Sequence, residues 1–505
     1  MMDSLIPLFV IIPLGIAFLI PLVWKIIPSL FKYLPATGLL FLLVIAFYML
    51  INSGSETLVY KVGGWEPVKN IPIGIHLVVD GLAMSMLVII NMIGFLACLY
   101  AVPYMKKFTG ENYFFILFSL MVAGMNGVVI TGDLFNLFVF LELSVISSYA
   151  LVAFGSSKDE LEASFKYQVL GGIASLLILF ALALTYWYTS TLNIDDISKV
   201  MKLAPAGKVT VFIQLFFIAG FGLKGALIPF HAWLPDAHSS APSPISAMLS
   251  GVLIKAIGIY ALLRLFFNMF QLSTEVSIII TTIGVISMVL GVILAIGQWD
   301  MKRLFAYHSI SQMGYVVMAA GISMVILSRG GDRNVAILSL TGGLFHMFNH
   351  SVFKGLLFLN AGAVEYSTGT RNLKELGGLS EILPITSATS LGASLSISGI
   401  PPFNGFFSKL IIIIAAIQGR FYFLALLAVL VSIITLASFM KVQRYAFLDK
   451  LKKTRFLNLK EVPFLMCLPM VILALLCFVM SLMIIPGIRE IFLMPAVNSL
   501  ISLIT

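Results

Sequence analysis

Apolar runs of 18 or more residues recur along the whole of this 505-residue chain. Each run is long enough to cross the hydrocarbon core of a bilayer, about 30 Å thick, as a helix. Hydrophobic residues make up 60% of the sequence and charged residues only 10%, whereas about 25% charged residues is usual in soluble domains. The sequence therefore predicts an all-α integral membrane protein with no separate soluble domain.

About fourteen membrane spans are expected from these runs. They lie near residues 5–24, 29–52, 78–101, 113–131, 134–154, 164–188, 209–238, 242–267, 275–298, 301–325, 335–363, 385–417, 421–445 and 463–486. The first run has no basic segment before it and no small-residue cleavage site after it, so a membrane span is expected there rather than a signal peptide. The apolar tail after Pro486 is short and is expected to lie along the interface.

The distribution of Lys and Arg predicts the orientation of the chain. Loops that follow odd-numbered spans hold about twice as many of these residues as loops that follow even-numbered spans, and basic loops favour the cytoplasmic side. We therefore expect a multi-pass protein of the cell membrane with both termini on the outer side. The net charge of +9 reflects these loops and does not indicate a nucleic acid partner.

The segment from Val209 to Leu265 is apolar enough to sit in a bilayer, yet it contains charged or titratable residues and several prolines. These are Lys224, His231, Asp236, His238 and Lys255, with Pro229, Pro235, Pro242 and Pro244. A charge at the bilayer centre costs roughly 3 kcal/mol on insertion scales, so such residues normally face a hydrated interior. A proline also frees a helix carbonyl that needs another partner. A broken helix, buried lysines and an internal polar path are therefore expected, a combination typical of ion translocation.

A second broken span is predicted at 385–417. The run SISGIPPFNGFFSKL places Pro401, Pro402 and Gly405 just before Lys409. Because five spans separate the two broken segments, they indicate two inverted five-helix repeats. The predicted organisation is residues 1–112 as helices 1–3, 113–267 as the first repeat, 268–445 as the second repeat, and 446–505 as helix 14 and the tail.

Glu142 is the only carboxylate deep within an otherwise apolar span, in FNLFVFLELSVISSYALV. It either forms a structural ion pair between two helices or carries protons, with Lys224 controlling its charge. Lys255 is a second buried amine on the neighbouring span. Lysine suits a proton relay because it releases its proton when desolvated, whereas arginine does not. Lys166 is either an additional relay group or a side chain that reaches the cytoplasmic surface.

The run HMFNHSVFKGLLFLN places His346, His350 and Lys354 four residues apart, which gives one helical stripe about 12 Å long. This spacing also occurs in metal sites, but no third ligand is evident, so a proton relay is favoured over a metal. Lys409 would continue the relay toward the outside. Three further histidines, His231, His238 and His308, are either relay groups or ordinary polar residues at helix breaks.

The three cysteines, Cys98, Cys467 and Cys477, all lie in apolar spans without a C-x-x-C pair. They cannot ligate an iron–sulfur cluster, and no disulfide is expected. No cofactor, metal, redox site or hydrolytic site is predicted in this chain, so any redox chemistry would belong to a partner.

The residues between about 75 and 445 resemble the antiporter-like family of respiratory complex I. Within it, the chain is most similar to the D-type subunit of Mrp cation/proton antiporters and to the equivalent H subunit of archaeal membrane-bound hydrogenases. The resemblance rests on the Glu142 and His346 segments quoted above, on SGIPPFNGFFSKL, on KRLFAYHSISQMGY, and above all on GLKGALIPFHAWLPDAHSSAPSPISAMLSGVLIKAIGIYAL.

This resemblance implies fourteen helices, two inverted repeats and a hydrophilic axis along the membrane plane. It implies that Glu142 and Lys224 form an ion pair, that Lys255 connects the two halves, and that the stripe with Lys409 serves the second half. The long lateral helix of the largest complex I antiporter subunit is not expected here.

The expected function is proton translocation, with or without coupled sodium, in a redox-driven complex such as a membrane-bound hydrogenase. The alternatives are the D-type subunit of a stand-alone Mrp-type Na+/H+ antiporter and an antiporter-like subunit of a NADH dehydrogenase-type complex. A self-sufficient transporter and a membrane scaffold without transport are further alternatives. Expected partners are other membrane subunits, the lipid bilayer, and iron–sulfur and nickel–iron hydrogenase-type subunits.

Overall fold

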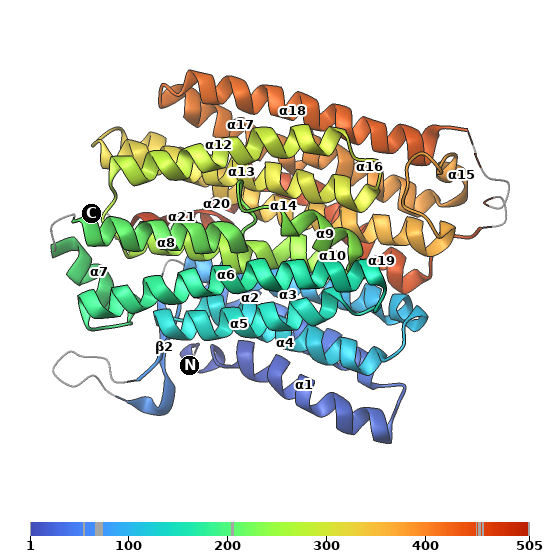
Figure 1. Cartoon of the computed structure of the whole chain (residues 1–505), viewed down its shortest axis with the longest axis horizontal. Coiled ribbons are helices and arrows are strands. Elements are labelled where there is room, and N and C mark those ends of the chain that lie inside the picture. Colours follow the sequence, from blue (N-terminus) through green and yellow to red (C-terminus); the bar gives the residue numbers. More distant parts are fainter. Residues whose placement is uncertain are drawn as a thin grey trace.

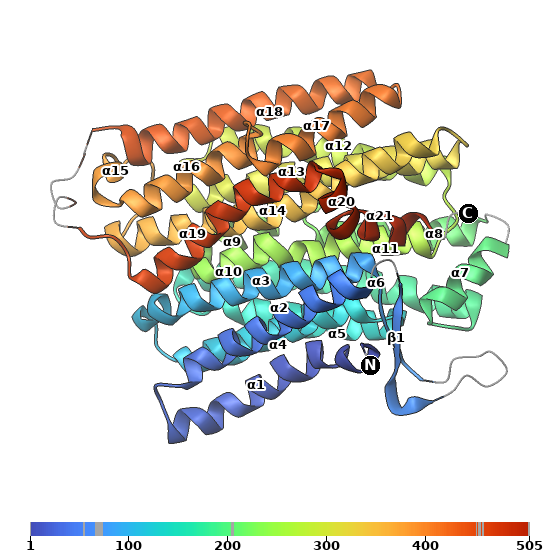
Figure 2. The ribbon, with the colours of Figure 1, turned by 180° about the vertical axis from the view of Figure 1, so that it is seen from behind.

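Long helices run roughly parallel to one another and form an elongated bundle (Figures 1 and 2). The computed structural model describes residues 2–53, 56–65, 74–203, 207–450, 452, 456 and 459–502. Helices account for nearly all of these residues, which confirms the predicted all-α class. In chain order the helices are α1 (Leu8–Ile26), α2 (Leu34–Ser53), α3 (Gly81–Tyr104), α4 (Glu111–Ile130), α5 (Leu134–Val152), α6 (Lys158–Thr189), α7 (Ile194–Leu203), α8 (Lys208–Lys224), α9 (Trp233–Ser240), α10 (Ser243–Met248), α11 (Ala261–Asn268), α12 (Thr274–Ile296), α13 (Met301–Ser328), α14 (Arg333–Thr368), α15 (Leu379–Ile382), α16 (Pro384–Ser398), α17 (Asn404–Gln418), α18 (Tyr422–Val442), α19 (Phe464–Val479), α20 (Pro486–Phe492) and α21 (Met494–Ile501).

Eleven helical stretches in the described part of the chain are long and apolar enough to cross a membrane. The other three expected spans take different forms. The segment 209–238 divides into α8 and α9, and the segment 385–417 divides into α16 and α17. The segment 335–363 lies within α14, a continuous helix of 36 residues that carries many polar side chains. The count of fourteen crossings, the inverted repeats and the four predicted domain boundaries stay predictions.

Two π-helical segments, Leu249–Leu253 and Lys255–Tyr260, join α10 to α11. Every residue of these segments is buried. The wider π turn is rare in proteins and is found mostly as short bulges, frequently at functional sites. The sequence predicts an ordinary helix over 242–267, so this local geometry is a difference from the expectation.

A small antiparallel hairpin pairs β1 (Leu58–Lys61) with β2 (His76–Val79), and Leu58 lies opposite Val79. It lies at the same end of the bundle as α7, the start of α1 and the end of α21 (Figure 2). Strand β1 and the start of β2 lie within residues 53–77, one of the longest polar stretches of the sequence. β-branched and aromatic side chains favour the strands, and burial alternates along β2.

The C-terminal helix α21 folds back onto the bundle at the end where the hairpin lies (Figure 2); that the tail lies along the membrane interface stays a prediction. Helix α21 packs against α3 and buries Pro495, Ala496, Val497, Leu500 and Ile501. The close approach requires a glycine at residue 81, because a Cβ there would lie 2.4 Å from the carbonyl carbon of Pro495. The Asn268 amide donates a hydrogen bond to the Ser499 carbonyl oxygen at 2.9 Å.

An ion pair ties α3 to α11 beside the hairpin. The Arg264 guanidinium donates to both carboxylate oxygens of Asp80, at 2.5 and 2.8 Å. Asp80 also begins α3, since its side chain accepts a hydrogen bond from the Ala83 amide at 3.0 Å. Both side chains are only 13% exposed.

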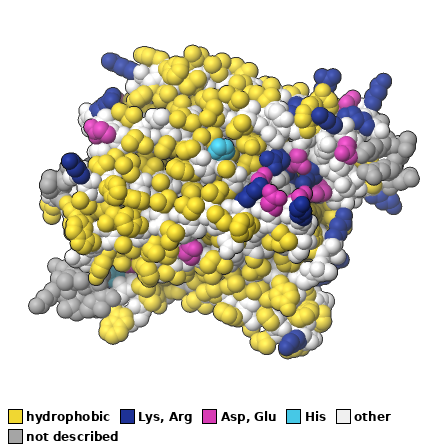
Figure 3. Space-filling view, viewed as in Figure 1, with side chains coloured by type: hydrophobic (Ala, Val, Ile, Leu, Met, Phe, Trp, Pro, Cys, Tyr) yellow, Lys and Arg dark blue, Asp and Glu magenta, His cyan; other side chains and the backbone are white. Residues whose placement is uncertain are grey.

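Apolar side chains cover most of the surface seen in Figure 3, whereas charged side chains gather toward the ends of the helices. The largest mixed-charge cluster lies near α9 and the beginnings of α6 and α13 (Figures 1 and 3). This distribution matches a bundle whose sides face lipid. The chain is a multi-pass membrane protein.

Candidate functional site

Glu142 and Lys224 meet between α5 and α8, and a serine of α6 connects them. The Lys224 Nζ lies 3.4 Å from the Glu142 Oε1 and donates a hydrogen bond to the Ser175 Oγ at 2.9 Å. Ser175 in turn donates to the Glu142 Oε1 at 2.5 Å. Lys224 is 1% exposed and Glu142 25% exposed. The two residues singled out in the sequence are therefore in contact, and Ser175 is a third member that the sequence did not point to.

The backbone of α5 is fixed near its beginning by Asp133. The Asp133 carboxylate accepts a hydrogen bond from the Asn136 amide at 2.7 Å and so caps the helix that carries Glu142. Burial raises the pKa of the Asp133 carboxyl, although the amides of Asn136 and Phe135 oppose the shift.

Helix α8 ends at Lys224 because the following residues cannot continue it. Ala226 has a left-handed backbone with φ of 53°, and Pro229 lacks the amide hydrogen that a helix needs. Two backbone groups at the break find side-chain partners: Trp233 Nε1 donates to the Leu223 oxygen at 2.9 Å, and the Ile228 amide donates to Ser287 Oγ at 2.9 Å. The break thus holds the Lys224 amine at a helix end inside the protein.

The break contacts the π-helical segment that contains Lys255. A Cβ at Gly258 would lie 2.5 Å from the Cα of Gly225, so residue 258 needs to be glycine for the two backbones to touch. Lys255 is fully buried and donates to the carbonyl oxygens of Ser250 and Gly251, at 2.5 and 2.7 Å. Its amine is therefore held by backbone dipoles and by no carboxylate of the described residues.

The stripe predicted on α14 is fully buried. His346 Nδ1 lies 3.0 Å from Ser408 Oγ, and its Nε2 lies 3.1 Å from Gln312 Oε1. Lys354 Nζ donates to the Phe305 carbonyl oxygen at 2.5 Å. Neither ring nitrogen of His350, between them, bonds to an atom of the described residues. The helix thus brings the three residues onto one buried line, as the spacing predicts.

His238, His308 and His350 lie among the buried lysines. The charged groups near His238 include Lys354 and Lys255, and those near His308 include Lys354 and Lys409. Both rings are fully buried, and none of their nitrogens bonds to a described residue. By contrast, His231 lies half-buried at the break between α8 and α9.

Lys409 stands on α17 just after the second break. Its Nζ donates to the Ile397 carbonyl oxygen at 2.7 Å and to Ser432 Oγ at 3.2 Å. It is 3% exposed and lines a cavity of about 230 Å³. Beside it, Asn404 and Asn349 exchange hydrogen bonds across the break, each at 3.0 Å. These amides were not identified from the sequence, because Asn and Ser are common in loops as well as in sites.

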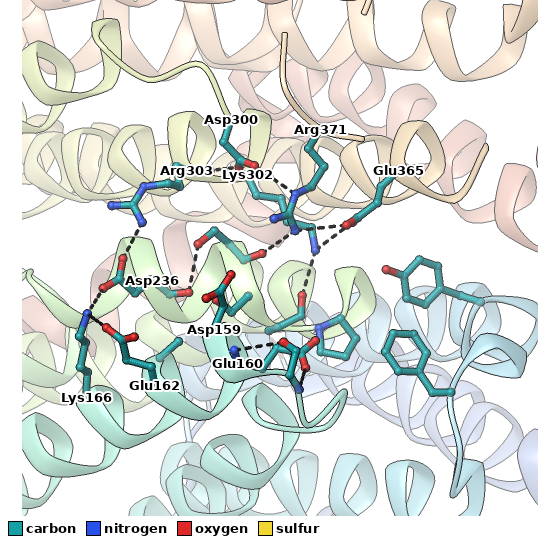
Figure 4. A pocket seen from close by; sticks show the side chains of 18 residues that line it. Asp159, Glu160, Glu162, Lys166, Asp236, Asp300, Lys302, Arg303, Glu365 and Arg371 are labelled. Carbon is teal, nitrogen blue, oxygen red and sulfur yellow. Dashed lines mark hydrogen bonds and ion pairs between the residues drawn. The ribbon is translucent and has the colours of Figure 1, made fainter. Parts of the chain in front are cut away.

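A charged cavity of about 560 Å³ opens at the end of the bundle where α6 and α13 begin and α9 ends. Asp236 joins Lys166 and Arg303 there, at 3.0 and 2.6 Å (Figure 4). Figure 4 shows Lys302, Arg371 and Glu365 grouped at a second position around the same cavity. Lys166 is 45% exposed and also pairs with Glu162, so its side chain lies at the surface rather than on the buried line.

One short segment separates the buried His238 from the charged cavity. Ser239, Ser240, Ala241 and Pro242 line the cavity, and His238 directly precedes them. Lys302 also lines the cavity and acts electrostatically on the His238 ring. The geometry thus brings a solvent-accessible charged cavity next to the first buried histidine.

The described residues contain no group of three or more His, Cys, Asp or Glu side chains that could hold a metal ion. Cys98, Cys467 and Cys477 are buried and unpaired. The chemistry that this arrangement supports directly is the movement of protons and charge between carboxylate, amine and imidazole groups.

Residues 131–435 match the family described as NADH:quinone oxidoreductase/Mrp antiporter, TM, and residues 65–115 match NADH-Ubiquinone oxidoreductase (complex I), chain 5 N-terminus. The D subunit of the Na(+)/H(+) antiporter of Alkalihalophilus pseudofirmus is 35% identical over 429 residues, which cover 84% of this chain and 83% of the relative.

Two solved structures have the same fold. A chain of the Mrp complex from Dietzia sp. DQ12-45-1b aligns with a TM-score of 0.87 and 26% identity, covering 99% of this chain and 98% of that chain. A chain of the membrane-bound sulfane sulfur reductase, an archaeal respiratory membrane complex, aligns with a TM-score of 0.86 and 27% identity, covering 99% of both chains.

Proposed function

We propose that this chain, which belongs to the NADH:quinone oxidoreductase/Mrp antiporter family, is an antiporter-like subunit that translocates protons, with or without coupled sodium. The observation that carries this proposal is the contact of Glu142, Ser175 and Lys224 at one end of a buried series of lysines and histidines that reaches Lys409. A structural ion pair alone would not require this series, because each buried amine is costly.

Proton uptake by Glu142 would be controlled by the position of Lys224. While the amine lies beside the carboxylate, the two opposite charges stabilise each other. If Lys224 moves toward the π-helical segment and Lys255, Glu142 loses its counter-charge and binds a proton, which the return of Lys224 expels. The contact of Gly225 with Gly258 supports this proposal because it places the hinge of Lys224 against the helix that carries Lys255.

The further path would run from Lys255 through His350 and Lys354 to Lys409. The imidazoles whose nitrogens lack protein partners among the described residues would bond to water, because buried polar groups are nearly always hydrogen-bonded. Water and imidazole together can carry protons between the amines. His346, bonded to Ser408 and Gln312, would orient the end of the path near Lys409.

We further propose that the charged cavity beside Asp236 faces the cytoplasm and that protons enter the series there, through His238. The excess of Lys and Arg in the loops at this end favours that orientation. Both termini would then lie on the outer side of the cell membrane.

The exposure of Glu142 supports assembly with a partner protein. On α5, Phe135, Val139 and Ile146 lie on the same face as Glu142 and are 48%, 45% and 61% exposed. A carboxylate that opens onto such an apolar face is unfavourable against lipid, so another membrane subunit would cover it. We assign any redox cofactor to partner subunits, such as iron–sulfur and nickel–iron hydrogenase-type proteins.

The test is ion pumping by the whole complex, purified from native membranes and reconstituted in vesicles. Glu142→Gln should abolish pumping, while the matched change Glu275→Gln on an exposed first turn should leave it intact. Pumping by Glu142→Gln at the wild-type rate would contradict the proposal. Unimpaired transport by the single chain in liposomes would instead favour a self-sufficient transporter.

Identifying the proteins that co-purify with the tagged chain in mild detergent distinguishes the two assemblies. The membrane-bound sulfane sulfur reductase among the similar structures supports a redox-driven complex, whereas the Na(+)/H(+) antiporter relative supports a stand-alone Na+/H+ antiporter. Recovery of iron–sulfur and nickel–iron-type subunits would identify the first, and recovery of small membrane subunits alone would identify the second.

A further inference from the structure

A groove runs along the outer flank of the second half of the bundle, away from the buried series. Its volume is about 670 Å³, and its floor is formed by α12. Ile278, Thr282 and Ile286 follow one another at one-turn spacing along that helix and are exposed. Val325 of α13 and the first residues of α18, Phe421 to Leu424, complete its walls. The groove is thus mainly apolar and opens to the side of the protein.

One end of the groove carries an arginine that forms no ion pair with a described residue. Arg420 lines the groove between α17 and α18, is exposed, and forms no ion pair with a described residue. Arg329 stands one helical turn beyond Val325 on α13, at the same end. The residues that line the groove include no Asp or Glu. A negatively charged group is therefore the complementary partner of this end.

Arg420 occupies a backbone position at a helix end that is more often held by glycine. Arg420 follows the end of α17 with a left-handed φ of 64°. Its amide bonds to the Ile417 oxygen, and the next amide, of Phe421, bonds to the Ala416 oxygen at 2.7 Å. In this helix-ending motif glycine is the usual residue, because a left-handed side chain costs roughly 1 kcal/mol. An arginine in that place keeps a guanidinium at the mouth of the groove in spite of the cost.

We propose that this groove binds an anionic phospholipid. Arg420 donates to the phosphate, for which the planar guanidinium is well suited, and Arg329 adds a second positive charge. An acyl chain lies along Ile278, Thr282 and Ile286. Tyr422 and Phe423, 63% and 68% exposed, lie at the headgroup level, where aromatic side chains are favoured.

The test places a fluorophore in the groove, on Ile286→Cys of the full chain in its complex, in phosphatidylcholine vesicles. The three natural cysteines are buried and should not react. Brominated phosphatidylglycerol should quench the fluorophore at an about fivefold lower mole fraction than brominated phosphatidylcholine, the preference that one arginine gives for an anionic over a zwitterionic headgroup. Equal quenching by both lipids would overturn the proposal, as would absence of quenching because a partner protein covers the groove.

Arg420→Gly removes the positive charge but keeps the turn, because glycine suits the left-handed backbone position. In this variant the two brominated lipids should quench the fluorophore equally. The control Arg333→Gln removes an arginine at the start of α14 that does not line the groove, and it should keep the fivefold preference. A preference that persists in Arg420→Gly would show that the arginine does not select the lipid.

Discussion

Gly225 and Gly258 touch backbone to backbone, so the break that follows Lys224 rests directly on the π-helical segment that carries Lys255. No side chain fits between them. A movement of the helix end at Lys224 therefore also displaces the π-helical segment that carries Lys255. This contact gives the two halves of the proposed path a mechanical connection.

Gly258→Ala should slow ion translocation by about tenfold or more, because the added methyl group displaces the break from the π-helical segment and small displacements in a reacting site are costly. Ion pumping in reconstituted vesicles measures the effect. Gly172→Ala is the control, since a Cβ at that position meets no atom within 4 Å. If Gly258→Ala pumps at the wild-type rate, the contact has no role in coupling the Lys224 helix end to the segment that carries Lys255.

Ser175→Ala should reduce pumping by about tenfold while the complex still assembles. The change removes the hydroxyl that bonds to both Glu142 and Lys224, and hydrogen bonds to charged groups contribute about 1.5–3 kcal/mol. Ser164→Ala removes a buried hydroxyl from the same helix that bonds only to the Tyr149 carbonyl, and pumping should be unchanged. Equal losses in the two variants would indicate a general effect on α6.

Lys409→Arg should abolish proton transfer although it keeps the positive charge, because arginine does not release its proton. The adjoining cavity of about 230 Å³ leaves room for the larger side chain. Lys441→Arg, whose amine also donates to backbone carbonyl oxygens, is the matched control and should remain active. If Lys409→Arg pumps normally, Lys409 serves as a fixed charge only.

Arg264→Leu should destabilise the protein by about 3–5 kcal/mol, because it leaves the Asp80 carboxylate buried without its partner. The double variant Asp80→Asn with Arg264→Leu should recover part of this loss, since no charge is stranded. Lys199→Ala, which removes surface ion pairs with Asp195 and Asp196 from a lysine side chain that is 65% exposed, should change stability by less than about 0.5 kcal/mol. Thermal unfolding in detergent measures all three. A double variant less stable than Arg264→Leu would contradict this account.

Asp133→Asn should be at least as stable as the wild type at neutral pH, and the advantage should vanish in acid. The pKa of Asp133 is raised by burial, so the folded protein disfavours the charged form; this unfavourable contribution exists above the folded-state pKa and disappears as pH falls through it. Asn keeps the acceptor that caps α5, whereas Asp133→Ala loses it and should be about 1 kcal/mol less stable. Unfolding temperatures between pH 4 and pH 7 provide the check. A wild type that is more stable than Asp133→Asn at pH 7 would refute the burial argument.

The sequence was sufficient for features that depend on local composition. Hydropathy located the long helices, and prolines near Lys224 and before Lys409 located both breaks. The four-residue spacing of His346, His350 and Lys354 was enough to place them on one buried line, because that spacing is a property of the helix alone.

Features that arise from packing could not be predicted in this way. The π-helical geometry at Lys255 has no signature in the local composition, and Ser175 is marked only by its position opposite Glu142. Lys255, Lys354 and Lys409 each donate to carbonyl oxygens, which every residue possesses, and Lys409 also donates to the Ser432 hydroxyl, so no sequence motif identifies these partners. The hairpin pairs β1 with β2, two segments that are not adjacent in the chain and that hydropathy does not relate to one another.

The amines of Lys255, Lys354 and Lys409 all rest on neutral backbone oxygens. Two unit charges about 10 Å apart repel each other by roughly 1.7 kcal/mol at an effective dielectric constant of about 20. With no carboxylate of the described residues bonded to these amines, that repulsion limits how many of the three can be positive at once. In the proposed path, the arrival of a proton at one end of the row would favour the departure of another at the far end, so each arriving proton would displace one already held.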